Sequence, residues 1–414
     1  MYNCYNFWRS EDEKLQKPTE KQLNRALEIS ERIIEADVFH VTLTGGEPFL
    51  FGKNLEQIIK LYRESNVGIR INSNITLAND EICDILMEYN VGVLSSIISH
   101  DEDQFNKTTQ NKVSFKRFVK GAQLLSNKGI YLSANMVVNK STLDSVYDTG
   151  KFAYELGFKG FNATRISPSN NGMIQNYDSL ILNNKDIVIL LDQLMELKSD
   201  FGMQVGTLNA LPYCAVDDIN KYGSIFNRSC VAGLTSAGVA SNGDLRACQH
   251  FDITYGNIFE RPLLEIWAEI PIWKKQYHND TCTGCAYDFK CGGGCKENAY
   301  KINKDMAGED NLKKDTIKNN KKTKISSFDP VNSVQLKRDL KIRDESFGST
   351  LFKDPSAYAY LDNFTTFYIK EKYPIRVLNR NDLVFIGSDI GVDNQYVSAL
   401  FATLINNNLG RDGG

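Results

Sequence analysis

The sequence of 414 residues lacks an excess of charge of either sign, because 48 Lys and Arg residues nearly balance 51 Asp and Glu residues. Nucleic-acid binding depends on clustered positive charge that neutralises phosphates, so this composition argues against a nucleic-acid partner. The sequence also lacks a run of about 18 apolar residues, which a membrane-spanning helix needs. The amino-terminal residues 1–17 contain no apolar stretch of the kind that directs secretion. We therefore expect a cytoplasmic protein with no membrane partner.

Cysteine is scarce as well, yet four of the nine cysteines fall in the segment 282–295, CTGCAYDFKCGGGC. In a reducing cytosol, clustered cysteines more often bind a metal or take part in catalysis than form disulfides. Their spacing is C-x2-C-x5-C-x3-C, and thiolates two residues apart in a tight turn can share one iron or zinc ion. The glycines at 292–294 let the backbone approach a cluster without a Cβ clash. The cysteines of this segment are Cys282, Cys285, Cys291 and Cys295.

A second cysteine element lies upstream, where Cys230 is followed by Gly243 and then by Cys248 in the turn SNGDLRAC. By contrast, Cys83 stands alone on a predicted helix, and we interpret it as a small buried apolar residue. The clustered cysteines do not fit that interpretation. Because C-x2-C pairs also build zinc ribbons, the cysteine spacing by itself leaves iron and zinc open.

The first two hundred residues alternate short β-rich runs with amphipathic helical segments. The stretch VFHVTLTGGEP has the period-two pattern of a strand, and NLEQIIKLYRE after it places apolar residues on one helical stripe. The pattern recurs at VGIRINSN, VGVLSSIIS, IYLSANMVV and FKGFNATRI, and the last helix of the series is NKDIVILLDQLMELK. Such alternation predicts an α/β fold with a parallel sheet, open or curled into a barrel.

The pattern changes after this region, and we divide the chain into four parts. We expect the barrel in residues 1–200, a small Cys-rich domain in 201–312, a Lys- and Asn-rich solvated linker in 313–330, and a small α+β module in 331–414. In the last part, GSTLF and AYAYL are joined by KDPS, which predicts a hairpin.

The order of motifs C...NGDLRAC...YGNIFERPLLEIW...CTGCAYDFKCGGGC resembles the SPASM module, an auxiliary iron-sulfur domain of radical S-adenosylmethionine (SAM) enzymes. The resemblance covers about Cys230 to Asp310 and favours iron over zinc. It implies that the preceding region is a partial (β/α)6 TIM-like radical SAM barrel. Such barrels carry a GGEP motif after the second strand, and here Gly45, Gly46, Glu47 and Pro48 follow a predicted strand.

The resemblance implies SAM and a [4Fe-4S] cluster as cofactors. Two glycines at a strand end allow close approach to the methionine part of SAM, and Glu47 with adjacent backbone groups can engage its amino group. The family places ribose contacts in the INSN segment, and strand-end residues further along are candidates for other SAM contacts, although each can equally be a strand-end cap. The candidates are Asn72, Ser73, Asn74, Ser96, Asn135 and Arg165, and no catalytic residue is assigned.

Two departures from the family pattern concern the cysteines that bind clusters. The SAM-binding cluster of the family uses C-x3-C-x2-C, of which Cys4 aligns with the third cysteine and Met1 with the second. We therefore expect that the sequence is truncated and that the first strand and first cysteine precede residue 1. The alternative is a degenerate partner protein that keeps only auxiliary clusters.

The auxiliary clusters depart from the family because no cysteine follows Cys295, whereas the family has one further downstream. At the expected position the sequence reads AGEDNLK, so Glu309 or Asp310 is a candidate ligand. We expect one auxiliary cluster on the first three cysteines of 282–295, incomplete or completed by a carboxylate. The second is expected to use Cys230, Cys248 and Cys295, with Cys214 or a substrate atom as fourth ligand.

By the same resemblance, the reaction begins with a 5'-deoxyadenosyl radical that removes hydrogen from an unactivated C–H bond, assisted by the auxiliary clusters. Many SPASM enzymes form thioether or carbon–carbon crosslinks in ribosomally made peptides (RiPPs), so the expected partners are a precursor peptide and a flavodoxin- or ferredoxin-type reductant. The segment 340–362 resembles a leader-peptide recognition element, in which Phe347-Gly348 enters the hairpin and an exposed strand captures the peptide.

Other functions stay open. The carboxy-terminal module is equally interpreted as a dimerisation or stabilising domain. Among enzymes, the alternative is an anaerobic sulfatase-maturating type that oxidises Cys or Ser to formylglycine. A zinc-ribbon binding module and a partner protein without radical chemistry are the non-enzymatic alternatives.

Overall fold

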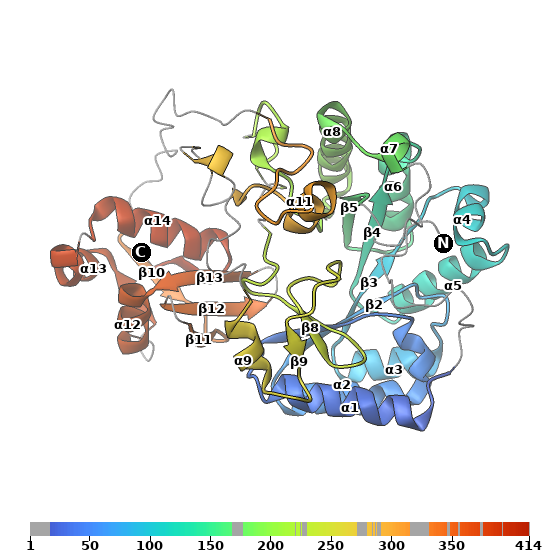
Figure 1. The fold of residues 1–414 in the computed structure, drawn as a ribbon, viewed down its shortest axis with the longest axis horizontal. Helices are drawn as coiled ribbons and strands as arrows, with labels where there is room; N and C mark the ends of the chain where they lie inside the picture. The colour runs from blue at the N-terminus through green and yellow to red at the C-terminus, as the bar shows by residue number, and fades with distance from the viewer. Residues whose placement is uncertain are drawn as a thin grey trace. The chain divides into compact units, whose positions relative to one another are not determined.

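The computed structural model consists of two compact units, Met1–Asn319 and Asn320–Gly414 (Figure 1). The division falls inside the segment 313–330 that the sequence analysis interprets as a linker, and residues 201–312 belong to the same unit as the sheet before them. The structure describes residues 17–167, 177–219, 221–223, 225, 230–270, 280–283, 285, 287, 291–314, 331–345, 348–354, 357–372, 376–390 and 392–413.

The first unit contains a six-stranded sheet in which the strands follow one another in chain order. Each neighbouring pair is parallel, and helices lie in the connections between strands (Figure 1). This arrangement confirms the predicted α/β fold and has the strand order of a partial (β/α) barrel. The strands are β1 (His40–Leu43), β2 (Gly68–Ser73), β3 (Gly92–Ser96), β4 (Leu132–Val138), β5 (Gly160–Arg165) and β6 (Gln204–Gly206).

Three helices of this unit that flank the sheet strands begin at polar residues whose side chains accept hydrogen bonds from the first helical turn. Thr19, Asn79 and Asn183 are such caps, and they satisfy backbone N–H groups that have no partner within the helix. The apolar stripe predicted after Asn54 is confirmed, because Leu55, Ile58, Ile59 and Tyr62 are buried. The helices are α1 (Glu20–Ile34), α2 (Leu55–Glu64), α3 (Asp80–Glu88), α4 (Glu102–Thr109), α5 (Ser114–Asn127), α6 (Val146–Glu155), α7 (Tyr177–Leu180) and α8 (Asn184–Phe201).

The two faces of the sheet differ in polarity, which matters for the site. In β2, Ile69, Ile71 and Ser73 are buried, whereas Arg70 and Asn72 on the alternate positions are half-buried. Strand register puts Asn72 beside Leu94, and Ser96, two residues on from Leu94, pairs with Asn135. Because side chains alternate along a strand, the polar residues Asn72, Ser96 and Asn135 lie on one face of the sheet.

The Cys-rich segment of the first unit is built around a small antiparallel sheet of β7 (Gly238–Val239), β8 (Asp244–Arg246) and β9 (Gly256–Asn257). Leu245, Phe251 and Ile266 are among the residues of its apolar core, and Ile29 of α1 packs against that core. The other elements of this segment are the short helix η3 (Tyr213–Ala215), α9 (Leu263–Ala268), η5 (Asp280–Cys282) and α11 (Lys296–Asn303).

The core beneath the sheet extends into the Cys-rich segment. Tyr213, Ala215, Cys291 and Leu312 are buried in the same cluster as the apolar residues of β2, β3 and β4. The cysteine-bearing loops are therefore fixed to the sheet by shared apolar packing, which positions the site described below.

The described residues of the second unit form two three-stranded sheets, three α-helices and the short helix η6. The predicted hairpin of GSTLF and AYAYL is confirmed by the antiparallel pairing of β12 with β13. One sheet has the order β14-β10-β15 and the other β11-β12-β13. The elements are β10 (Ser333–Leu336), β11 (Lys341–Glu345), β12 (Gly348–Asp354), β13 (Ala357–Asp362), α12 (Asn363–Lys372), β14 (Val377–Asn379), α13 (Arg380–Gly387), η6 (Ser388–Ile390), α14 (Asn394–Asn406) and β15 (Gly410–Asp412).

Within the described part of the chain, none of the helices combines the length and the apolar character needed to cross a bilayer.

Candidate cofactor and iron-sulfur sites

The GGEP turn follows β1 and is tied to the end of β2 through Glu47. The Ser73 hydroxyl donates to Glu47 Oε1 at 2.6 Å, and the backbone N–H of Asn74 donates to Oε2 at 2.9 Å. The N–H of Phe49 also donates to Oε1, so Glu47 caps the short helix η1 (Pro48–Asn54) that begins at Pro48. Burial raises the pKa of Glu47, and these hydrogen bonds oppose the rise. The carboxylate holds the turn in place.

The two glycines before Glu47 have positive φ angles, 89° at Gly45 and 57° at Gly46. A Cβ at either position would meet no atom within 4 Å, so glycine is required by the backbone conformation and not by crowding. The resulting open backbone at a strand end suits the close approach of a ligand.

The INSN segment offers one buried polar atom that the described residues leave without a hydrogen-bond partner. Ser73 bonds Glu47, and Asn74 Oδ1 accepts from the N–H and hydroxyl of Thr76. Asn72 Oδ1, however, is buried without a hydrogen-bond partner among the described residues. A buried acceptor left unpaired is costly, and a bound ligand would satisfy it. This observation fits a SAM site on the polar face of the sheet.

The candidates for SAM contacts on the later strands differ in their surroundings. Asn135 lies on the same face as Asn72, and its Oδ1 accepts from the Thr164 hydroxyl at 2.6 Å. Ser96 is on that face and exposed. Arg165 is different, because its guanidinium is buried and donates to Asp310, to Asn311 Oδ1 and to the carbonyl of Ala210. These hydrogen bonds join Arg165 to the Cys-rich segment.

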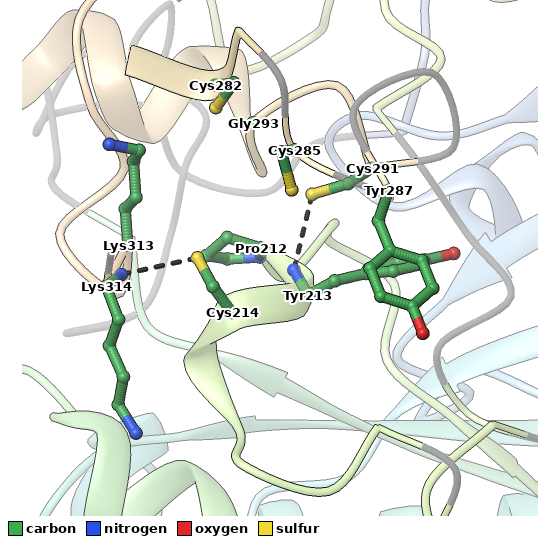
Figure 2. Close-up of a pocket in the computed structure, with 10 residues that line it drawn as sticks. All are labelled: Pro212, Tyr213, Cys214, Cys282, Cys285, Tyr287, Cys291, Gly293, Lys313 and Lys314. Atoms are coloured by element: carbon green, nitrogen blue, oxygen red, sulfur yellow. Dashed lines mark hydrogen bonds between the residues drawn. The ribbon is translucent and has the colours of Figure 1, made fainter. Parts of the chain in front are cut away.

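Four cysteines border one cavity in the Cys-rich segment (Figure 2). Cys282 and Cys285 approach it from one loop, Cys291 from the start of the Gly-rich turn, and Cys214 from η3 on the opposite side. The space between these side chains, including the open solvent at the mouth of the cavity, is about 340 Å³. The remaining lining residues are Pro212, Tyr213, Tyr287, Gly293, Lys313 and Lys314.

Backbone groups donate to the sulfurs of this cavity. The N–H of Tyr213 donates to Cys291 Sγ at 3.3 Å, and the N–H of Lys314 donates to Cys214 Sγ at 3.3 Å. Burial raises the pKa of both thiols, and these donors act in the opposite direction by stabilising the thiolate. Metal binding also requires the thiolate form. The arrangement fits a thiolate-ligated iron-sulfur cluster.

Cys230, Cys248 and Cys295 form a second group. Burial is the main cause that raises the pKa of Cys248, to about 12, and the pKa of Cys295, and Cys230 contributes to both rises. Glu297 is 2% exposed, and its Oε2 lies 3.9 Å from Cys295 Sγ. Lys301 forms an ion pair with Glu297. Glu297 could not be recognised from the sequence, because an acidic residue in the first turn of a helix is common and carries no distinctive signal.

Two expectations about the fourth ligands differ from the geometry. Cys214 lies on the cavity with Cys282, Cys285 and Cys291, whereas it was expected to serve the second group. Asp310 uses both carboxylate oxygens for Arg165 and for the backbone N–H groups of Cys295 and Leu312. The lone pairs of the Asp310 carboxylate are therefore already used by groups of the protein and not left for an iron atom. Cys4 and Phe347 lie outside the described residues.

A structural zinc site needs its ligands about 2.3 Å from a single ion. In the described ranges, no three His, Cys, Asp or Glu side chains meet closely enough to hold one ion in that way.

Comparison with known families matches residues 3–153 to the Radical SAM superfamily and residues 230–286 to SPASM, an iron-sulfur cluster-binding domain. Among curated proteins, the AdoMet-dependent heme synthase of Methanosarcina barkeri is 24% identical over 285 residues, which cover 65% of this chain and 80% of that protein. The antilisterial bacteriocin subtilosin biosynthesis protein AlbA of Bacillus subtilis is 23% identical over 292 residues, which cover 66% of this chain and 60% of that protein.

Among solved structures, Streptococcus suis SuiB has a similar fold, with a TM-score of 0.57 and 19% identity over 73% of this chain and 72% of SuiB. A second structure of SuiB, bound to the precursor peptide SuiA, gives a TM-score of 0.55 with 18% identity over 75% of this chain and 71% of that one.

Proposed function

Because the chain belongs to the radical SAM superfamily and carries a SPASM iron-sulfur cluster-binding domain, we propose that it is a peptide maturase acting on a ribosomally made precursor peptide. SAM and [4Fe-4S] clusters are the cofactors of these domains. Bound SAM supplies the radical chemistry that removes hydrogen from a C–H bond, and the protein supplies position and a dry site. The expected product is a thioether or carbon–carbon crosslink.

The residues of this chain that would hold SAM are those at the strand ends. Gly45 and Gly46 leave the backbone open to the ligand, and Glu47 fixes their turn against β2. Asn72 Oδ1 is the acceptor that a ligand hydroxyl or amino group would satisfy. These positions stand as proposed contacts.

Our choice of a peptide as the substrate rests on the second unit. In its sheet β11-β12-β13, the described residues of β11 and β13 pair with β12 alone, so each strand has one edge without a strand partner. The strand β11 is charged, and charges disfavour pairing with a further strand; they belong to Lys341, Arg343 and Asp344. β13, with the sequence AYAYLD, is uncharged until its last residue. An extended peptide can add to such an edge through main-chain hydrogen bonds.

The side chains of β13 also suit a peptide. Ala359 and Leu361 are buried, so the strand is anchored on one face. Tyr358 and Tyr360 alternate with them, their ring centroids are 5.6 Å apart, and Tyr360 is 44% exposed. Exposed tyrosine rings give large contact areas to a bound chain. The names of AlbA and of the SuiB–SuiA complex support the same substrate class.

The activity test uses anaerobically reconstituted full-length chain, SAM, dithionite and the precursor peptides encoded beside the gene. The proposal predicts that one peptide raises release of 5'-deoxyadenosine and loses hydrogen in a crosslink detected by tandem mass spectrometry. Conversion of a Cys or Ser to formylglycine would establish the sulfatase-maturating alternative. Stimulation by a tetrapyrrole precursor and by no peptide would favour the chemistry named for the Methanosarcina relative. Either result contradicts the crosslinking proposal.

The binding test examines β13 itself. Adding the precursor peptide should slow hydrogen exchange of amides in Ala357–Asp362 and leave those of Lys341–Glu345 unchanged. Tyr360→Ala should weaken peptide binding. Tyr154→Ala, which removes a ring of similar exposure (45%) from the first unit, is the matched control and should have no effect. Equal protection of both strands, or equal effects of both substitutions, would rule out capture by β13.

A further inference from the structure

Cys214 lies outside the matched SPASM residues, in the connection that follows β6. It occupies the middle of η3, between the buried residues Tyr213 and Ala215, which belong to the core of the first unit. The backbone that carries Cys214 is therefore fixed by apolar packing. Its thiol is turned toward the cavity that Cys282, Cys285 and Cys291 border from the other side (Figure 2).

We propose that Cys214 supplies the fourth thiolate of the auxiliary cluster held by Cys282, Cys285 and Cys291. The sequence has no cysteine after Cys295, where the family pattern expects the last ligand. In this chain a cysteine that precedes the SPASM segment takes that role. The inference rests on the iron-sulfur content of the domain and not on the peptide substrate, so the two can fail separately.

Two hydrogen bonds to sulfur involve η3. The N–H of Tyr213 donates to Cys291 Sγ, so two successive residues of η3 contact the site, one by a donor and one by its own thiol. The Cys214 sulfur in turn accepts from the N–H of Lys314, a residue 100 positions later. Donors of this kind stabilise thiolates that bind iron and influence the cluster potential.

The segment in which the family carries its last cysteine has a different role here. It brings Lys313 and Lys314 to the cavity wall. Lys313 pairs with Glu309 at 2.7 Å, and Lys314 pairs with Asp217 at 2.9 Å. Four thiolates around a cluster concentrate negative charge, and the Lys313 ammonium offsets part of it. The segment thus supplies a cation and one backbone donor in place of a ligand.

The two carboxylates that were candidate ligands, Glu309 and Asp310, already form hydrogen bonds with other groups of the protein. Glu309 accepts from the Thr281 hydroxyl at 2.7 Å and from Lys313, and its side chain is 49% exposed. Asp310 is bonded through both oxygens to Arg165 and to backbone N–H groups. Of these candidates, Cys214 alone lines the cavity. A cluster closed by four thiolates leaves no iron open to substrate, so its role is electron transfer.

The first test compares Cys214→Ala with Cys83→Ala in the full-length, anaerobically reconstituted chain. Cys83 is fully buried in the first unit, and it lies on α3, away from the cavity. We expect Cys214→Ala to lose about one iron per chain and to show the paramagnetic signal of a [3Fe-4S] cluster after mild oxidation, because one iron has lost its thiolate. Cys83→Ala should keep the wild-type iron and sulfide content. Wild-type spectra and iron content in Cys214→Ala would overturn the proposal.

The second test needs no substitution, so it is unaffected by a variant that fails to fold. The wild-type chain, with clusters loaded or removed by chelation, is treated with iodoacetamide, and labelled cysteines are located by mass spectrometry. Iron-bound thiolates resist alkylation. Cys214 should be protected in the loaded protein to the same degree as Cys285 and should react after cluster removal. Labelling of Cys214 in the loaded protein while Cys285 stays protected would refute the assignment.

Discussion

The Arg165 guanidinium donates to both carboxylate oxygens of Asp310, and this ion pair joins the last residue of β5 to a residue 145 positions later in the chain. Both side chains are almost completely buried, at 3% and 0% exposure. Asp310 Oδ2 also accepts from the backbone N–H of Cys295. The sheet and the cysteine-bearing turn are therefore connected through one carboxylate.

Replacing Asp310 by Asn should strongly destabilise the first unit. The substitution keeps the shape of the side chain but leaves the buried Arg165 charge without a counter-charge, a change that costs about 3 to 5 kcal/mol. Anaerobic urea unfolding measures the effect. Glu64→Gln is the control, because it removes an exposed pair with Lys60 and should cost about 1 kcal/mol or less. Similar losses in both variants would show that the buried pair has no special role.

The Gly-rich turn CGGGC allows a matched comparison of two glycines. Gly292 and Gly294 both have positive φ, at 60° and 89°. A Cβ at Gly292 meets nothing within 4 Å, whereas at Gly294 it would lie 2.8 Å from Asp310 Oδ2 and 3.0 Å from Pro212 Cδ. Each Ala substitution should cost about 1 to 2 kcal/mol for the backbone conformation. Gly294→Ala should cost about 1 to 3 kcal/mol more through overpacking, measured by urea unfolding. Equal costs would contradict the crowding seen at Gly294.

The stability contributed by Glu47 should decrease as pH rises. Burial raises its pKa in the folded protein above the ordinary value of 4.5, so the folded state holds the proton more tightly than the unfolded state. That contribution is fully present below pH 4.5 and is lost as pH rises through the folded pKa. The difference in unfolding free energy between wild type and Glu47→Gln, measured from pH 4.5 to neutrality, should therefore move against the wild type. A constant difference would mean that Glu47 titrates normally.

Glu297 should influence the potential of a cluster held by Cys230, Cys248 and Cys295. Its carboxylate is buried and 3.9 Å from Cys295 Sγ, where a negative charge favours the oxidised state. Glu297→Gln removes that charge and should raise the reduction potential, measured by potentiometric titration with paramagnetic resonance. Glu155→Gln, at an exposed position on α6, should leave the potential unchanged. A fall in potential in Glu297→Gln would contradict this electrostatic argument.

The parts of the fold that depend on short-range patterns could be predicted from the sequence. The burial of Ile58 and Tyr62 on α2 follows from helical spacing, and the pairing of β12 with β13 follows from two alternating runs around a turn. The partners of Cys214 and Arg165 could not be predicted, because they are fixed by residues 45 to 146 positions away, brought close by the packing of the whole unit. Spacing identifies which side chains can ligate iron but not which of them meet.

The contact of α1 with the small sheet β7-β8-β9 has an evolutionary consequence. Arg25 stacks on the Phe259 ring at 3.3 Å and donates to the carbonyl of Asn242 at 3.1 Å, while Ile29 of the same helix packs against the core of that sheet. A lineage could not exchange its cysteine-rich half with a relative by simple recombination after β6, since the incoming segment would have to match a helix whose Arg25 lies 217 residues before its partner Asn242. Inheritance of the two halves should therefore be linked, with compensating changes at Arg25 and Phe259.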